Sequence, residues 1–195
     1  TADGSNGQVL KTDGSGTLSW TANSGSGASN ITGLSDALTE DNSVYLGSDP
    51  SSTTSTAEYN VAVGMTALDA VTTGDRNTAI GYNVLSANTT GYYNTASGAN
   101  ALKLNTTGYL NVAIGESSLG ANTTGNQNVA IGTYSLTSNT TAGGNTAIGS
   151  YASYYNTTGH SNVGIGYESL RYNATGSYNV AVGRYSLNGA SGNNL

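Results

Sequence analysis

The chain has 195 residues, a net charge of −6 and only 8% charged residues, against roughly 25% in an average globular domain. The excess of acidic over basic residues argues against nucleic acid or an anionic membrane surface as a partner. No apolar run approaches the ~20 residues of a membrane-spanning helix, so we expect no membrane insertion. Cysteine is absent, which excludes disulfides.

The first 20 residues predict a β-hairpin-like segment. Two short β-prone runs, residues 8–11 and 17–20, flank Asp13-Gly14-Ser15-Gly16. Glycine and aspartate supply the positive φ angles that a tight hairpin turn requires. We therefore expect an antiparallel pair of strands with this turn between them.

Residues 21–42 have the composition of a Gly/Ser-rich linker followed by a short connector. Within the connector, the apolar residues Leu34, Ala37 and Leu38 suggest one short helical turn. A periodic region then covers residues 43–195, and its first turn, 43–59, is expected to be an atypical cap because terminal repeats lack a neighbour on one side. We expect the chain to be a fragment of a longer protein.

One five-residue motif organises the periodic region. Asn-(Val/Thr)-Ala-(Ile/Val)-Gly recurs at a constant interval of 17 residues, with Asn94-Thr95-Ala96-Ser97-Gly98 as a weakened copy. A fixed short period is typical of repeat architectures. Counting the opening asparagine as position 1, the eight copies begin at residues 60, 77, 94, 111, 128, 145, 162 and 179.

Two positions of the repeat carry large aliphatic residues, and we expect both to line the core. Position 3 is alanine in most copies and would face the opposite side of a strand, where its small size suits the close approach of another backbone. The expected core residues are Val63, Ile80, Ile114, Ile131, Ile148, Ile165 and Val182 at position 4, and Leu68, Leu85, Leu102, Leu119, Leu136, Leu170 and Leu187 at position 9.

The second half of each repeat is polar and regular, with Asn-Thr-Thr-Gly at positions 12 to 15 in four of the eight copies and close variants in others. Threonine suits a strand, asparagine and glycine suit corners, and stacked asparagines form amide ladders. A coil of 17 residues is too short for a helix pair or a propeller blade. The sequence therefore predicts an all-β fold, a β-solenoid of about nine 17-residue coils with two short strands and two corners each.

The repeated motif resembles the head repeat of trimeric autotransporter adhesins, the YadA-like β-roll, over residues 43–187. In that family three identical chains pack side by side into a trimeric stalk. The resemblance thus implies a parallel homotrimer. Composition points the same way, because this chain has too little aliphatic core for a monomer of its length.

A second resemblance covers more of the chain. Residues 7–20 followed by the Asn-Thr-Ala-Ile-Gly and Asn-Thr-Thr-Gly repeats look like tail-fibre proteins of bacteriophages, notably marine ones. Such fibres are trimeric. The resemblance implies a virion location, with other fibre proteins and a host-surface glycan or protein as partners.

No arrangement of acids, bases or nucleophiles in the sequence predicts catalysis. His160 has no companion ligand, Glu116 and Glu168 are three coils apart, and Asp69 and Asp75 are expected to be solvated. We therefore predict no catalytic residue, no metal site and no cofactor.

Tyrosine is the one aromatic residue that recurs, fourteen times, mostly beside the predicted corners. A tyrosine ring combines an apolar face with a polar tip, which suits stacking on a sugar. The alternative is that the rings fill the contacts between chains. The expected glycan-contacting residues are Tyr82, Tyr134, Tyr151, Tyr167 and Tyr185. Each Asn-Thr-Thr triplet also matches a glycosylation acceptor, although we expect most of these sites to be bare.

The sequence thus predicts a non-enzymatic, structural and adhesive fibre segment, most consistent with a phage tail fibre that spaces or contributes to host attachment. One alternative is the head or stalk of a bacterial trimeric surface adhesin. A polysaccharide-binding or ice-binding solenoid is a further alternative, although the adjacent threonines leave only one outward threonine column for ice.

Overall fold

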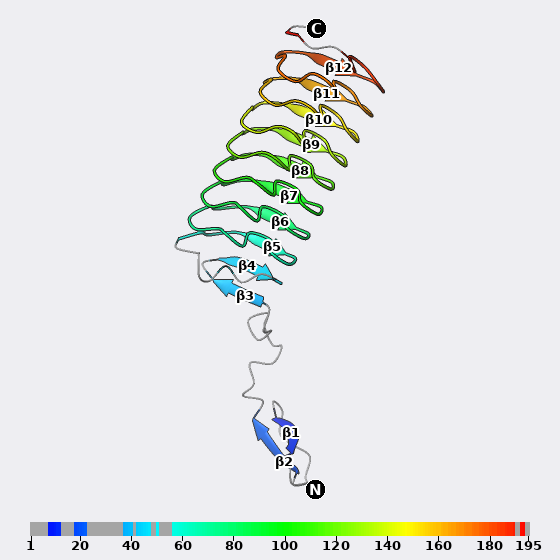
Figure 1. Cartoon of the computed structure of the whole chain (residues 1–195). Coiled ribbons are helices and arrows are strands. Elements are labelled where there is room, and N and C mark those ends of the chain that lie inside the picture. The colour runs from blue at the N-terminus through cyan, green and yellow to red at the C-terminus, as the bar shows by residue number, and fades with distance from the viewer. Residues whose placement is uncertain are drawn as a thin grey trace.

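The computed structural model describes residues 8–12, 18–22, 37–40, 42–47, 50, 56–189 and 192–193, and these form two β-sheets (Figure 1). The smaller sheet pairs β1 (Gln8–Thr12) with antiparallel β2 (Leu18–Ala22). The expected antiparallel pair of strands is confirmed, and its second strand ends at Ala22 rather than at residue 20. The expected turn at residues 13–16 lies outside the described residues.

The larger sheet contains ten strands, of which nine are parallel. It begins with β3 (Ala37–Glu40), which pairs antiparallel with β4 (Ser43–Leu46). The expected helical turn is therefore wrong at residues 37–40, because this segment supplies hydrogen-bonding partners to the first strand of the stack; residue 34 lies outside the described residues. The remaining strands are β5 (Val61–Val63), β6 (Thr78–Ile80), β7 (Thr95–Ser97), β8 (Val112–Ile114), β9 (Val129–Ile131), β10 (Thr146–Ile148), β11 (Val163–Ile165) and β12 (Val180–Val182).

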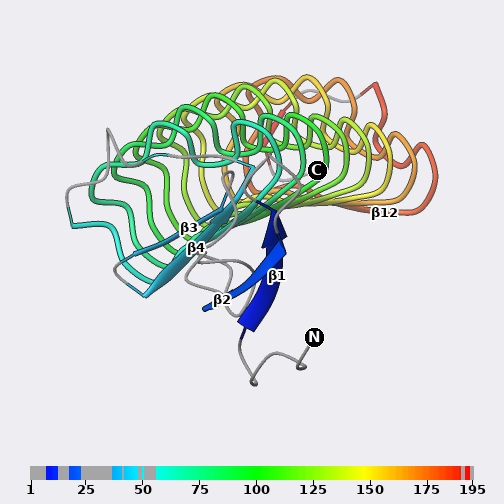
Figure 2. The same ribbon diagram turned by 90° about the horizontal axis from the view of Figure 1, so that it is seen from below.

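The parallel strands stack as successive coils of a β-solenoid, as predicted. Each strand pairs in register with the residues 17 positions later, for example Ala130 with Ala147. Viewed along the stack, the strands lie on one side of the coils, and the rest of each coil returns on the other side (Figure 2). Each coil contributes one strand to the sheet rather than the two that we expected, because the Asn-Thr-Thr-Gly half forms bends.

Hydrogen bonds between coils continue outside the strands. The backbone N–H of Gly132 donates to Ile114, and that of Tyr134 donates to Glu116, in both cases in the preceding coil. The N–H of Thr123 donates to the carbonyl of Thr140 in the following coil. Backbone groups of the bends are thereby satisfied by neighbouring coils, as buried backbone requires.

Three corners of each coil are formed by residues in the left-handed region. These are positions 7, 9 and 17, and position 9 is leucine in most coils, with φ of 47° to 54° for these leucines. Leucine visits this region at a cost of about 1–2 kcal/mol. The stack tolerates this cost because the left-handed turn directs each leucine into the interior, where Leu68, Leu85, Leu102, Leu119, Leu136 and Leu170 are 0% exposed.

The core confirms one predicted column and corrects the other. Position 9 is buried as expected, apart from the partly exposed Leu187 in the last full coil. Position 3, not position 4, provides the inward side chain of each strand, because a three-residue strand with its middle residue inward turns both neighbours outward. The prediction that position 4 lines the core is therefore wrong in this chain: Val63, Ile80, Ile114 and Val182 are 37%, 45%, 42% and 66% exposed, and Ile131, Ile148 and Ile165 are partly exposed.

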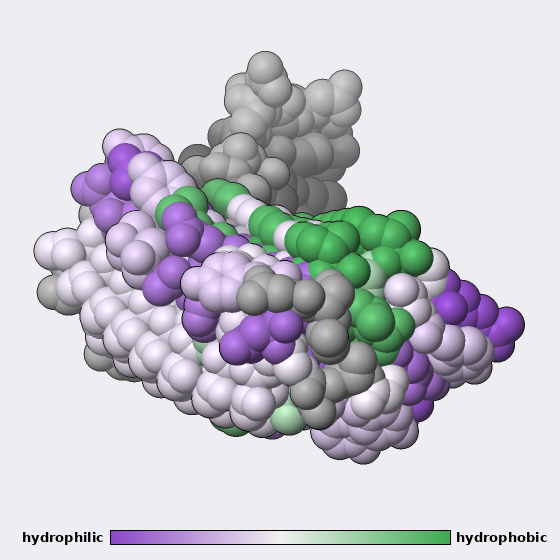
Figure 3. Space-filling view, turned by 90° about the horizontal axis from the view of Figure 1, so that it is seen from above, coloured by the Kyte–Doolittle hydropathy of each residue, from purple (hydrophilic) through white to green (hydrophobic). Residues whose placement is uncertain are grey.

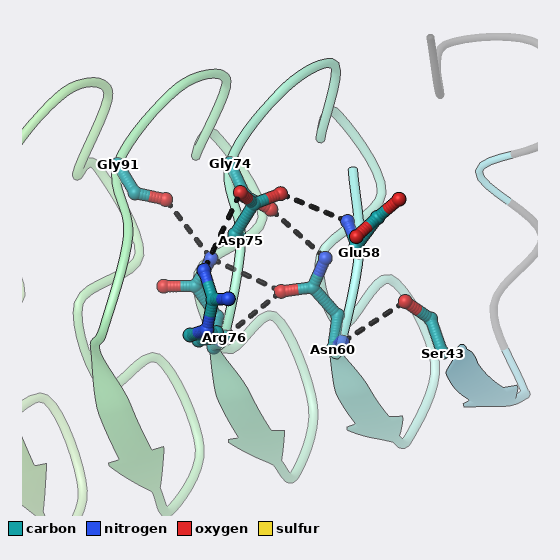
Figure 4. A network of polar contacts seen from close by, with 8 residues as sticks. Ser43, Glu58, Asn60, Gly74, Asp75, Arg76 and Gly91 are labelled. Carbon is teal, nitrogen blue, oxygen red and sulfur yellow. Dashed lines mark hydrogen bonds and ion pairs between the residues drawn. The ribbon is translucent and has the colours of Figure 1, made fainter. Parts of the chain in front are cut away.

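Two buried ladders of asparagine side chains hold the coils together, as predicted. At position 1, the Asn60 amide oxygen accepts the backbone N–H of Asn77 at 2.8 Å, and the Asn60 amide nitrogen donates to the Gly74 carbonyl at 2.8 Å (Figure 4). Ser43 begins this ladder by accepting the Asn60 N–H. At position 12, Asn105 donates to the Asn88 amide oxygen at 2.8 Å.

Candidate functional site

The first candidate surface is the outer side of the parallel sheet, here called the sheet face and defined as positions 2 and 4 of strands β5–β12. All of these residues are valine, isoleucine, threonine or serine, so the sheet face contains no charge. Figure 3, a view onto the stack from above, shows apolar residues gathered in one band on the side that carries the strands.

This uncharged face is unusual for a parallel sheet. Parallel sheets are normally covered on both sides, whereas the solenoid interior covers only one side of this sheet. Exposure is greatest near the ends of the stack, with Val61 at 41% and Val180 at 61%, and the outward residues of strands β9–β11 are partly exposed. Exposed apolar side chains that gather on one face of a protein mark an interaction surface.

The second candidate surface, here called the tyrosine patch, consists of Tyr134, Tyr151, Tyr154, Tyr155, Tyr167, Tyr172 and Tyr185. The rings come from positions 6, 7, 10 and 11, so stacking of the coils brings them together. Tyr155 and Tyr172 are stacked with centroids 5.2 Å apart and an interplanar angle of 17°. The rings of Tyr134 and Tyr151 are stacked at 5.3 Å.

Charged side chains contact the rings of the tyrosine patch. Arg171 forms an ion pair with Glu168 at 2.6 Å and lies over the rings of Tyr151 and Tyr172, 5.2 and 5.3 Å from their centroids. The hydrogen bond from Arg171 lowers the pKa of Glu168, while burial opposes the shift. The negative charge of Glu116 raises the pKa of the Tyr134 phenol, which points at it.

The structure brings together four of the five tyrosines predicted to contact a glycan. Tyr82 is exposed but lies three coils before Tyr134, apart from the patch. Sequence reasoning missed Tyr154, Tyr155 and Tyr172, because it considered only rings beside the glycine and asparagine positions. The 17-residue interval between Tyr155 and Tyr172 was the signal that they stack.

A smaller aromatic group lies next to the N-terminal ends of the strands, at the positions that immediately precede them. Arg76 is held between the rings of Tyr59 and Tyr93, 5.0 and 5.4 Å from their centroids. Nearby, Tyr92 and Tyr109 stack at 4.9 Å with their planes 2° apart. Aromatic residues thus lie beside both ends of the strands that form the sheet face.

The Asn-Thr-Thr triplets are not accessible acceptors in the folded chain. Asn88, Asn105, Asn122 and Asn139 are 0% exposed, and their amide nitrogens donate to carbonyls inside the coil. The first threonine of most triplets also bonds internally, as Thr106 does by donating its hydroxyl to the Thr123 carbonyl. The second threonine is exposed and forms the single outward threonine column that we expected.

The acidic residues and the histidine that the sequence analysis considered as catalytic candidates have separate partners in the structure. Glu168 is occupied by Arg171 and by the Asn188 amide, and His160 packs edge-on against Tyr178 at 4.9 Å. Asp75 accepts the Glu58 N–H, as Figure 4 shows. Within the described ranges, no three His, Asp or Glu side chains gather to hold a metal ion.

No family model matches the chain, and the searches of curated proteins and of solved structures find no significant match. Its function must therefore be inferred from the sheet face and the tyrosine patch. Among the residues whose structure is described, there is no helix with the length and apolarity needed to span a membrane.

Proposed function

We propose that this chain is a non-enzymatic segment of a homotrimeric attachment fibre of the bacteriophage tail-fibre type, located in the virion. The observation that carries the proposal is the uncharged, exposed sheet face, which runs along the whole stack of coils. The sequence resemblance to trimeric fibre and adhesin repeats, noted above, suggests three chains as the number that cover this face.

A second copy of this chain fits the sheet face because the coils of the two copies have the same spacing along the stack. Coils rise by about 4.8 Å each, so a parallel copy in register places the side chains of each coil beside those of the equivalent coil along the entire stack. Burying apolar residues such as Ile114 and Ile131 stabilises association by about 25 cal/mol per Å² of apolar area removed from water. The position-3 alanines, which we expected at the contact, lie inside each coil instead.

The solenoid also suits a spacer. The parallel strands at ~4.8 Å intervals make a rod on the order of 40 Å long, and the asparagine ladders join each coil to its neighbours. Such a rod holds surface groups at fixed separations, which is what multivalent attachment requires.

The tyrosine patch is the surface that we assign to host contact, with a cell-surface glycan as the ligand. A stacked aromatic pair is worth about 0.5–1.5 kcal/mol beyond its area burial, whereas even a millimolar dissociation constant needs about 4 kcal/mol. Binding at one patch is thus weak. Three chains per fibre and several fibres per particle raise the effective concentration and supply the avidity.

Sedimentation of the wild-type chain and of Ile131→Asp tests this proposal. We expect a wild-type trimer, and a folded monomer for Ile131→Asp, because the new charge lies in the contact rather than in the interior of the chain. Thr124→Asp, on an exposed position outside the sheet face, is the matched control and should remain trimeric. A stable wild-type monomer at micromolar concentration contradicts the proposal, as does an Ile131→Asp trimer.

A further inference from the structure

We propose that an open hollow over Gly120, next to the tyrosine patch, binds a saccharide that carries an anionic group. The hollow has a volume of about 420 Å³ and is lined by residues that include Lys103, Leu104, Ser117 and Thr137. This inference rests on the proposed function and specifies the ligand class and the place where it binds.

The hollow exists because one coil lacks a side chain at position 10. The equivalent residues of the neighbouring coils are Lys103 and Thr137, so the backbone at this position accepts a side chain. Gly120 does not have a positive φ, and an added Cβ would lie 3.2 Å from the nearest atom, the Ser117 carbonyl oxygen. Glycine is therefore not required by the turn at this site, and its effect is to open the surface.

The lining combines groups that recognise a sugar. Leu104, which is 48% exposed, and Ala121 supply apolar surface, while the Asn100 amide and the Ser117 hydroxyl supply polar groups. Ligand sites of this kind combine an apolar wall with a few polar groups that fix orientation. A pyranose presents the same mixture of C–H faces and hydroxyl edges.

Lys103 indicates that the ligand carries a negative charge. Among the cations within residues 56–189, Lys103 is the one for which the structure shows neither a carboxylate nor an aromatic ring as a partner. Arg76, Arg171 and Arg184 have such partners. The protein as a whole is acidic, so a single unpaired cation at the rim of a hollow favours a carboxylate or phosphate group on the ligand.

The residues that line the hollow stack directly beside residues of the tyrosine patch. Along position 10, Thr137 in the wall of the hollow is followed one coil later by Tyr154; along position 7, Ser117 is followed by Tyr134. The hydroxyl of Tyr134 donates to Glu116 at 3.3 Å, which holds that ring beside the hollow. A saccharide of several units can thus fill the hollow with one unit and stack the next on a tyrosine. None of these positions belongs to the sheet face, which is the surface that we assign to the contact between chains.

The test uses the whole chain on a glycan array that carries saccharides with carboxylates, saccharides with phosphates and neutral saccharides. Two variants alter the site: Lys103→Gln removes the charge, and Gly120→Tyr fills the hollow. Thr73→Tyr is the control, since it places the same ring on an exposed position of a coil that does not line the hollow. Sedimentation of every variant confirms that the oligomer is intact.

We expect the wild type to bind anionic saccharides, and each site variant to weaken binding by at least about tenfold, while Thr73→Tyr changes binding little. Whether the chain binds the saccharides with carboxylates or those with phosphates identifies the anionic group of the ligand. Three results overturn the inference: a preference for neutral saccharides, binding that survives Gly120→Tyr, or an intact trimer that binds no anionic saccharide. The last result leaves the fibre proposal standing, whereas a monomeric wild type removes the fibre proposal itself.

Discussion

Replacement of Asn111 by alanine tests whether the asparagine ladder at position 1 stabilises the stack. The Asn111 amide oxygen accepts both the backbone N–H and the side-chain amide of Asn128, at 3.0 and 3.2 Å. Its amide nitrogen donates to the Gly125 carbonyl at 2.9 Å and to the Asn94 amide oxygen at 3.1 Å. Alanine removes all four hydrogen bonds from a residue that is 0% exposed.

The expected cost follows from which partners keep another hydrogen bond. The Gly125 carbonyl still accepts from Asn122, and the Asn128 side chain still donates to Ala142. The Asn128 backbone N–H loses its acceptor inside the stack, which costs about 1–3 kcal/mol, and each net hydrogen bond adds about 0.5–1.5 kcal/mol. With this penalty and the loss of the other three hydrogen bonds, we expect a fall of about 2.5–7.5 kcal/mol per chain in the free energy of unfolding.

Urea denaturation followed by circular dichroism measures this loss, and thermal melting should show a fall of about 5–30 °C for a chain of this length. Asn126→Ala is the matched control, because Asn126 belongs to the same coil but is partly exposed and outside both ladders. Equal unfolding midpoints for the two variants would refute the reasoning. Asn111→Asp, which keeps the shape but places a charge against two acceptor oxygens, should be at least as destabilising as alanine.

Two further predictions concern a corner and an ion pair. Gly132→Ala should lower the free energy of unfolding by about 1–3 kcal/mol or more. The reason is that Gly132 has a φ of 130° and an added Cβ would lie 2.6 Å from a backbone atom of Gly149. Urea denaturation measures the change, and Gly120→Ala is a control that should be milder. Because Arg171 lowers the pKa of Glu168 in the folded chain, the ion pair should stabilise the protein above the ordinary carboxyl pKa and cease to do so as pH falls through the folded-state pKa. The difference in unfolding midpoint between the wild type and Glu168→Gln should accordingly narrow at low pH. A difference that stays constant with pH would contradict the prediction.

Much of this fold was predictable because each copy of a strict repeat lies in the same surroundings as its neighbouring copies. A 17-residue interval places every copy of a residue directly beside the next, so the asparagines at positions 1 and 12 had to form columns. Buried amide columns satisfy one another, which is why ladders followed from composition and period alone. The leucines at position 9 were assigned to the interior for the same reason, since a column of large aliphatic residues gains most from burial.

The direction in which each column points depended on the path of the chain within a coil. Sequence reasoning placed isoleucine inside and alanine at a contact, whereas the structure turns Ala130 inward and Ile131 outward. In the structure, a leucine in the left-handed turn at position 9, such as Leu136, shares the buried cluster with the alanine in the middle of the strand, Ala130. A leucine in this conformation is not visible in a pattern of polar and apolar residues.

The candidate sites depended on tertiary structure in the same way. Tyr154 and Tyr155 become part of a patch because the bend after position 9 exposes positions 10 and 11 side by side with rings from position 7. Gly120 looks like any other glycine in a chain that has 28 of them. Its significance follows from the side chains that the adjacent coils place above and below it, and these become its neighbours only when the coils stack.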